Sequence, residues 1–274
     1  MLKQRIVTAL MLGLAFLLAL FAAPRWLWQA LVLAMVWQAA SEWGRLSGLS
    51  VRGAQAYRWG LPVLLGGILA ADDALGANGA TWLHLVFYGS AILLWVFVVP
   101  AWLIGNWQPK WPRFLAVTGV LVIVPTALAL LDLRAADPWI LLFCMAMVWI
   151  ADSAAYFSGR RFGKTKLAPA ISPGKTWEGV YGALAAVTLF ILLCWLAGAF
   201  HPYPMFFPGI LIAGCWWVGL AIIGDLFESA IKRLAGVKDS GTLLPGHGGL
   251  LDRIDALTST LPFAAVALML QRLS

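Results

Sequence analysis

The run from residue 229 to residue 255, SAIKRLAGVKDSGTLLPGHGGLLDRID, concentrates acids, bases and glycines between segments apolar enough to cross a bilayer. In a helix that covers the start of this run, Asp225, Ser229 and Lys232 share one face and Glu228 lies beside them. Acid, hydroxyl and base at one membrane boundary are suited to handling a phosphorylated substrate beside lipid.

A second acidic pair follows at Asp252 and Asp255, which share a face if a helix begins near Leu251. Carboxylates from two helices can converge on a hard cation, and Mg²⁺ takes one or two of them while keeping positions for water and phosphate oxygens. Between the helices, Gly248 and Gly249 permit close backbone approach to phosphates. The pattern predicts a site for a metal-bound nucleotide.

Each part of this pattern also has a purely structural interpretation. Asp225 could pair with Lys232, Asp252 could pair with Arg253, and the glycines could form a tight turn. For any one of these features alone the structural interpretation is the better one. Their concentration in a single short run at a membrane boundary favours function.

Upstream, Asp152 lies inside an apolar segment, about two helical turns before a basic loop. An ionisable side chain within a membrane segment is a functional candidate by default. The alternative is a carboxylate that pairs with Arg160 or Arg161 and only holds helix ends together.

The basic loop continues through Ser172, which is followed by proline as in an N-cap with proline at the first helical position. A helix start at this point would aim free amides and Lys175 at an anion. The triplet Gly174-Lys175-Thr176 ends like a P-loop, but that motif requires glycine where the chain has Pro169. The loop therefore predicts an anion site that is not a P-loop, and a basic loop that only sets topology is the alternative.

The composition defines the setting of these residues. Of the 274 residues, 62% are hydrophobic and 11% are charged, which is too apolar for a water-soluble domain. The apolar runs show no period-2 alternation, so helices are favoured over a barrel. The chain is predicted to be an all-α, polytopic membrane protein with about nine spans, near residues 6–23, 26–41, 57–71, 82–104, 114–131, 138–157, 180–199, 206–227 and 254–271.

The basic residues predict the orientation. With nine spans, the N-terminus shares one side with the loops near 42–56, 105–113, 158–179 and 228–253, and that side receives 16 of the 19 Lys and Arg residues. The positive-inside rule makes this side cytoplasmic, so the N-terminus and the candidate site are expected there. The net charge of +7 then reflects topology and attraction to anionic lipid, and no nucleic-acid partner is predicted.

The acidic residues point to the C-terminal part of the chain, since seven of the twelve follow residue 150. Residues 1–135 are expected to form a scaffold of membrane helices and to supply any dimer interface. Residues 136–274 are expected to form the catalytic region of the same continuous membrane domain.

The segment 1–23 has features of a signal peptide, but its apolar stretch is long and leads into another span, so a retained helix is predicted. The three cysteines lie in apolar spans without paired spacing, which predicts neither a disulfide nor a zinc site.

Three motifs together resemble a known family. They are D-S-A-A-Y-F-S-G-R-R-F-G-K-T-K-L at 152–167, I-S-P-G-K-T-W-E-G at 171–179 and the run S-x-I-K-R-x₄-K-D-x-G-x₂-L-P-x-H-G-G-L-x-D-R-I-D at 229–255. The last run looks like the C-terminal signature of the phosphatidate cytidylyltransferases, also called CDP-diacylglycerol synthases, and shows no departure from it. Residues 1–135 match that family only as a set of hydrophobic spans.

The resemblance implies that CTP and phosphatidic acid give CDP-diacylglycerol and pyrophosphate, with Mg²⁺ required and potassium left open as a second cation. It also implies a homodimer in a bacterial-type inner membrane, with the active site facing the cytoplasm. On the family's motif positions, Asp225 and Asp252 hold the metal and Asp255 lies behind them. The remaining candidates for catalysis or substrate binding are Lys232, Arg253, His247, Lys175, Ser229, Arg233, Lys238, Asp239, Gly248, Gly249, Asp152 and Ser172.

The physical chemistry of this reaction fits the residues independently. Two polyanions must meet, so a metal ion and basic side chains must screen their repulsion. No general base is required, because phosphatidate already presents an ionised oxygen.

Other functional classes make different demands on the sequence. A transporter would need midplane charge in related halves of the chain, whereas these charges gather at one end. A CDP-alcohol phosphotransferase would need a D-G-x₂-A-R type arrangement, and a hydrolase built on Ser229, His247 and Asp252 would need a G-x-S-x-G elbow, but the sequence contains neither. A related CTP-dependent cytidylyltransferase that acts on another lipid phosphate stays open.

Overall fold

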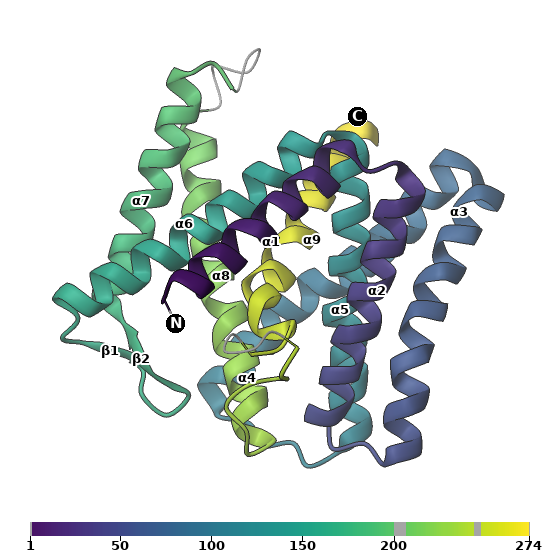
Figure 1. The fold of residues 1–274 in the computed structure, drawn as a ribbon, viewed down its shortest axis with the longest axis horizontal. Helices are drawn as coiled ribbons and strands as arrows, with labels where there is room; N and C mark the ends of the chain where they lie inside the picture. The colour runs from purple at the N-terminus through teal and green to yellow at the C-terminus, as the bar shows by residue number, and fades with distance from the viewer. Residues whose placement is uncertain (1, 200–206, 244–247, 274) are drawn as a thin grey trace.

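The computed structural model describes residues 2–199, 207–243 and 248–273. They form a bundle of helices with one short β-hairpin at its edge (Figure 1). In chain order the elements are α1 (Leu2–Ala22), α2 (Arg25–Leu46), α3 (Val51–Leu93), the π-helical turn η1 (Leu94–Val98), α4 (Val99–Gly105), α5 (Pro112–Ala136), α6 (Pro138–Phe162), β1 (Lys166–Ala168), β2 (Ser172–Thr176), α7 (Trp177–Leu196), α8 (Phe207–Leu234) and α9 (Leu251–Leu273).

Within the described residues, six helical segments are long and apolar enough to cross a membrane. One of them, Val51–Gly105, contains both predicted spans 57–71 and 82–104, and Gly76, with φ +67°, breaks α3 between them. The described apolar part of α1, Gly13–Ala22, is shorter than a span. The all-α, polytopic membrane architecture is confirmed, whereas the count of nine stays a prediction.

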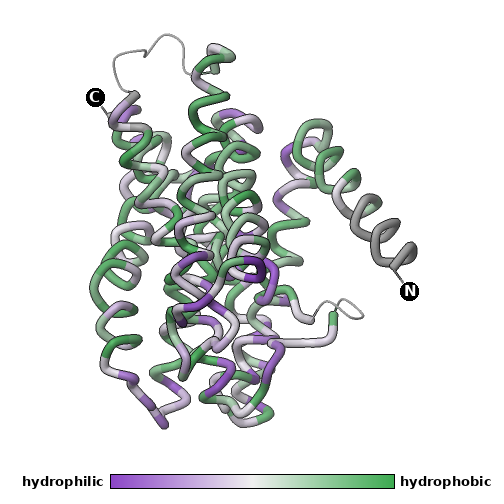
Figure 2. Tube along the Cα trace, turned by 90° about the vertical axis from the view of Figure 1, so that its left-hand side faces the viewer, coloured by the Kyte–Doolittle hydropathy of each residue, from purple (hydrophilic) through white to green (hydrophobic). Residues whose placement is uncertain are grey.

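The loops that were predicted to share one side lie toward one end of the molecule (Figure 1). This end holds the α2–α3 turn, the α4–α5 loop, the hairpin and the C-terminal end of α8. The α1–α2 and α5–α6 turns and the end of α9 lie at the other end. Figure 2 shows hydrophilic residues gathered toward the end with the hairpin, while the helices beyond it are mostly hydrophobic. The fold thus groups the basic loops as the charge pattern predicts.

Helix α5 forms the centre of the bundle and packs against α2, α3, α6 and α9. Most of its side chains between Val122 and Leu133 are buried, since neighbours surround it on several sides. The N-terminal helices therefore pack around the same central helix as α9, which carries two of the candidate acids.

An aromatic cluster fixes the part of α8 where its acidic residues begin. The ring of Phe227 lies 5.5 Å from that of Trp95, 5.2 Å from that of Trp102 and 6.4 Å from that of Trp43, centroid to centroid. The buried indole of Trp43 donates a hydrogen bond to the Leu115 carbonyl at 2.8 Å, so its polar atom is satisfied. Rings from the N-terminal half thus hold α8 in place beside the candidate site.

The segment 172–176 is a strand, so the predicted helix start at Ser172 is wrong. Strand β2 pairs antiparallel with β1, with Lys166 opposite Thr176 and Ala168 opposite Ser172. Helix α7 begins only at Trp177, and the Thr176 hydroxyl caps it by accepting a hydrogen bond from the amide of Gly179 at 3.2 Å. Serine before proline suits either conformation, and pairing with β1 decides between them.

Candidate active site

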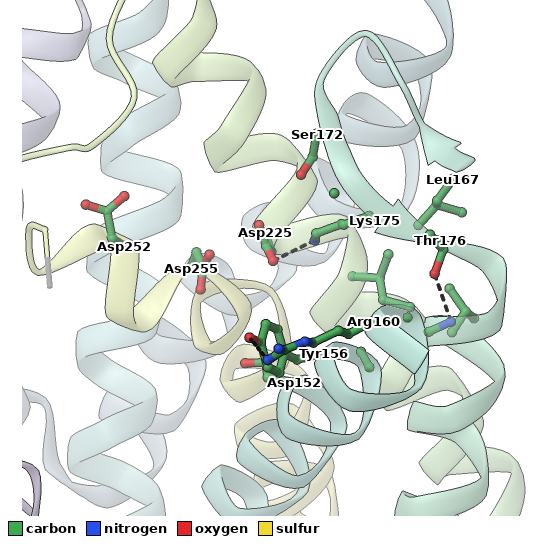
Figure 3. Close-up of a pocket in the computed structure, with 16 residues that line it drawn as sticks. Asp152, Tyr156, Arg160, Leu167, Ser172, Lys175, Thr176, Asp225, Asp252 and Asp255 are labelled. Atoms are coloured by element: carbon green, nitrogen blue, oxygen red, sulfur yellow. Dashed lines mark hydrogen bonds and ion pairs between the residues drawn. The ribbon is translucent and has the colours of Figure 1, made fainter. Parts of the chain in front are cut away.

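A cavity of about 540 Å³ lies where α6, β2, α7, α8 and α9 meet. Figure 3 shows four carboxylates around it: Asp152 from α6, Asp225 from α8, and Asp252 and Asp255 from α9. Its size is that of a site for a small molecule, roughly 300–1,000 Å³. The structure therefore brings the four acids singled out in the sequence to one place, which we call the acidic cavity.

The Asp225 carboxylate has two partners within the protein. The Lys175 ammonium reaches across from β2, with Nζ 2.6 Å from Asp225 Oδ2 (Figure 3). The Ser229 hydroxyl, one turn along α8, donates to Asp225 Oδ1 at 3.4 Å. The side chains of Lys175 and Asp225 are 21% and 33% exposed, so water screens their attraction, and pairs of this kind contribute about 0–1 kcal/mol. The pair can therefore exchange partners at little cost.

The Asp252 carboxylate is hydrogen-bonded on both oxygens. Oδ1 accepts from Lys232 Nζ at 2.6 Å, and Oδ2 accepts from the backbone amides of Ser240 and Gly249 at 2.9 and 2.8 Å. The same ammonium contacts Glu228 Oε2 at 2.6 Å, so a buried cation joins α8 to α9. Breaking a buried group of charges leaves one uncompensated and costs about 3–5 kcal/mol. These contacts fix Asp252 at the edge of the acidic cavity.

Like charges crowd the wall of the acidic cavity. When ionised, the Asp255 carboxylate would be repelled by those of Asp225, Glu228 and Asp152, and Asp225 would also repel Asp152. Lys175 offsets part of this repulsion at Asp152. A bound cation would relieve the remainder, because an opposite charge nearby favours the ionised form of each acid.

The donor set fits Mg²⁺. Among the described residues, no three His, Cys, Asp or Glu side chains form a complete metal site by themselves. Mg²⁺ does not need such a cage, because it binds through one or two carboxylates and fills its other positions with water and phosphate oxygens. Asp225 and Asp255, with Asp252 at the edge, offer such oxygens at one cavity.

Helix α6 contributes two residues that were not candidates. Asp152, Tyr156 and Arg160 all line the acidic cavity, and Arg160 Nη1 donates to the Tyr156 hydroxyl at 3.3 Å. On sequence grounds Arg160 is only a pairing partner for Asp152. The spacing of four residues, which places all three on one helix face, is the signal that could have identified them. Arg160 adds a second positive charge to the cavity wall beside Lys175.

The two candidate glycines lie against carboxylates. A Cβ on Gly248, whose φ is +80°, would lie 2.6 Å from Asp252 Oδ2, and a Cβ on Gly249 would lie 2.5 Å from Glu42 Oε2. Their lack of a side chain therefore lets the loop before α9 close around these two acids.

The other candidates divide into three groups. Ser172 lines the acidic cavity with Lys175. His247 lies outside the described residues. Of the candidates that the structure describes, four are exposed and do not line the cavity: Arg233, Lys238, Asp239 and Arg253.

Glu42 on α2 was not a candidate, although it is fully buried at 0% exposure. Its Oε1 accepts from the Leu250 amide at 2.9 Å and from Gln38 Nε2 at 2.7 Å. Its Oε2 accepts from the Leu251 amide at 2.9 Å and from the Ser240 hydroxyl at 2.8 Å. An acid at the end of an apolar segment was the available signal.

The fold and the site together define a polytopic membrane protein that holds carboxylates and bases around one cavity between its helices. The chain belongs to the cytidylyltransferase family, whose family model matches residues 3–271. Three similar proteins are each named phosphatidate cytidylyltransferase. The protein of Pseudomonas aeruginosa is 40% identical over 270 residues, which cover 97% of both chains. Those of Haemophilus influenzae and Brucella melitensis are 35% and 36% identical, covering 96% and 94% of this chain and 97% and 90% of their own.

Proposed function

We propose that this chain is a phosphatidate cytidylyltransferase, which transfers CMP from CTP to phosphatidic acid and releases pyrophosphate. Relatives of that name match almost the whole chain. The observation that carries the proposal is the acidic cavity, because residues from all three family-like motifs line it: Asp152 from the first, Lys175 from the second and Asp252 from the third.

In the proposed reaction, a phosphate oxygen of phosphatidate attacks the α-phosphorus of CTP. The new P–O bond gives CDP-diacylglycerol, and the bond to the β-phosphate breaks to release pyrophosphate. Lys175 and Arg160 would reduce the repulsion between the two polyanions. Since the attacking oxygen is already ionised, the protein contributes positioning and charge, and no general base is required.

Asp225, Asp252 and Asp255 are the residues that would hold Mg²⁺. When bound, the ion would neutralise part of the triphosphate charge and polarise the α-phosphate. Ser229 orients Asp225, and Lys232 holds Asp252 against α8. Potassium remains an open second cation.

The proposed setting is the inner membrane of a bacterium, with the acidic cavity open to the cytoplasm. The grouping of the basic loops toward one end of the molecule supports this orientation (Figure 1). Homodimer formation stays a prediction.

The test is a transfer assay with the purified protein in mixed micelles. The protein is incubated with labelled CTP, Mg²⁺ and phosphatidate, and CDP-diacylglycerol and pyrophosphate are measured. Parallel reactions contain an isoprenoid phosphate or an ether-linked lipid phosphate in place of phosphatidate. Equimolar CDP-diacylglycerol and pyrophosphate, formed fastest with phosphatidate, are expected. Faster transfer to another lipid phosphate would favour the related cytidylyltransferase, and no transfer from CTP to any lipid would overturn the proposal.

A further inference from the structure

Helix α9 begins without a capping side chain of its own at the usual position. The first amides of a helix have no partner within it, and Ser, Thr, Asp or Asn at the preceding residue normally supplies one. Here the preceding residue is Leu250, which has no polar side chain. Glu42 of α2 supplies the missing acceptor, because its two oxygens accept from the amides of Leu250 and Leu251, both at 2.9 Å. A negative charge at a helix N-terminus is also electrostatically favourable.

Ser240 connects Glu42 to the proposed metal ligand Asp252. Its hydroxyl oxygen lies 2.8 Å from Glu42 Oε2 and 3.0 Å from Asp252 Oδ2. Its backbone amide donates to the same Asp252 oxygen at 2.9 Å. A shift of Glu42 would therefore move both the start of α9 and the loop residue that holds Asp252.

From these contacts we infer that Glu42 is a positioning residue of the active site, which sets the place of Asp252 from a helix outside the predicted catalytic region. The inference rests on the proposed function, in which Asp252 helps to hold the metal ion. Glu42 does not line the acidic cavity and acts only through Ser240 and the start of α9.

Two glycines of the run 229–255 mark the space that Glu42 occupies. A Cβ on Gly241 would lie 2.8 Å from Glu42 Oε1, and a Cβ on Gly249 would lie 2.5 Å from Oε2. Real Cβ atoms essentially never approach so closely, so both backbones pass the carboxylate only because they lack side chains. The glycines at 241 and 249 are thus explained by an acid 208 residues before Leu250.

The first experiment compares Glu42→Gln and Glu42→Asp with the wild type in the transfer assay. The backbone amides of Leu250 and Leu251 can only donate and each contacts a different Glu42 oxygen, so the NH₂ group of a glutamine must face one of them. We expect Glu42→Gln to lower kcat about 10- to 100-fold, as is typical when a residue behind a metal ligand is changed. The KM for CTP should change little, and Glu42→Asp, which keeps the charge, should lose less activity.

A second readout separates positioning from a merely structural role and does not depend on activity. Hydrogen exchange of the Leu250 and Leu251 amides should become faster in Glu42→Gln, while exchange in α6 stays as in the wild type. If the wild type itself transfers no CMP, the proposed function fails while this readout still reports on the Glu42 contacts. Unchanged exchange at both amides, or a kcat per folded molecule within about twofold of the wild type, which lies far below the expected loss, would overturn the inference.

A third variant tests the space between Glu42 and Gly241. Gly241→Ala should lower kcat, and combining it with Glu42→Asp should cost less than the product of the two single losses, because the shorter acid leaves room for the new methyl group. Gly219→Ala is the matched control, since a Cβ there meets nothing within 4 Å. Strictly multiplicative losses in the double variant would contradict direct contact at this position. Both substitutions in the double variant keep a carboxylate at position 42, so this experiment can still be done if Glu42→Gln fails to fold.

Discussion

Asp225 illustrates how one carboxylate can serve two states of the same site. Its Oδ2 contacts Lys175 in this structure, and Asp225 lines the acidic cavity where a cation is proposed to bind. One oxygen cannot keep the ammonium and a metal ion at full strength. Because both side chains are partly exposed, Lys175 can turn toward a substrate phosphate once Asp225 has another partner.

Asp225→Asn tests the proposed metal ligand. The substitution keeps the size of the side chain and removes its charge, so kcat for CDP-diacylglycerol should fall about 10²- to 10³-fold, comparable to the loss of one major electrostatic contact in an active site. The melting midpoint in detergent should change little, because the Lys175 pair is partly exposed. The control is Asp73→Asn, at an exposed position on α3. Equal activity of the two variants would show that Asp225 is not a metal ligand.

Lys175→Met tests the proposed phosphate contact from β2. A hydrogen bond to a charged group is worth about 1.5–3 kcal/mol, so kcat/KM for CTP should fall about 10- to 100-fold. Lys175→Arg should retain part of the activity because it keeps the charge. Lys164→Met, at an exposed position in the same basic loop, serves as the control. A loss no larger than that of the control would show that Lys175 contributes only its pair with Asp225.

At the scale of helices and strands, the residues that share a helix face could be predicted from their spacing, whereas the pairing of one strand with another could not. Asp252 and Asp255 were expected to share a face if a helix begins near Leu251, and α9 begins there. Serine followed by proline was compatible with a helix start, but pairing of β2 with β1 determined the conformation. Helical spacing also places Arg160 on the same face of α6 as Asp152. Arg160 was missed because, within that apolar segment, only the acid Asp152 stands out.

Helices α6 and α7 pack through small residues, and Gly182→Val tests this contact. A Cβ on Gly182 would lie 2.0 Å from the Ser158 hydroxyl oxygen, so valine must push the two helices apart. Overpacking of this kind costs about 1–3 kcal/mol and should lower the melting midpoint in detergent by roughly 2–10 °C. Gly89→Val is the matched control, because a Cβ there meets nothing within 4 Å. Equal midpoints for the two variants would contradict close packing at Gly182.

Across the whole molecule, the N-terminal helices do more than surround the catalytic region. Glu42 and Trp43 of α2 contact the loop before α9 and the aromatic cluster on α8, respectively. The sequence predicted a scaffold in residues 1–135 but gave no sign of these contacts, because partners about 200 residues apart leave no local pattern. The division at residue 135 remains a prediction. Residues before and after this position contact the elements that form the candidate site.

A second polar network joins the halves of the broken helix α3 to α5. His84 Nε2 lies 3.2 Å from Asp72 Oδ1, and His84 Nδ1 lies 2.8 Å from Asp132 Oδ2. The Tyr88 hydroxyl donates to the same Asp132 oxygen at 2.5 Å. Since Asp72 precedes the break at Gly76 and His84 follows it, the network holds both halves of α3 against the central helix.

His84→Ala is therefore expected to destabilise the fold without changing the chemistry. Removing the imidazole takes a hydrogen-bond partner from Asp132 and the 3.2 Å contact from Asp72, which should cost about 1–3 kcal/mol and lower the melting midpoint in detergent. The kcat per folded molecule at low temperature should match the wild type, because no member of the network lines the acidic cavity. Thr81→Ala, at a half-buried position on α3 whose hydroxyl donates to the Ala77 carbonyl of the same helix, should melt near the wild type. If the melting midpoint of His84→Ala equals that of Thr81→Ala, the network contributes little to stability. If the kcat of His84→Ala falls instead, the network is coupled to the active site through α5.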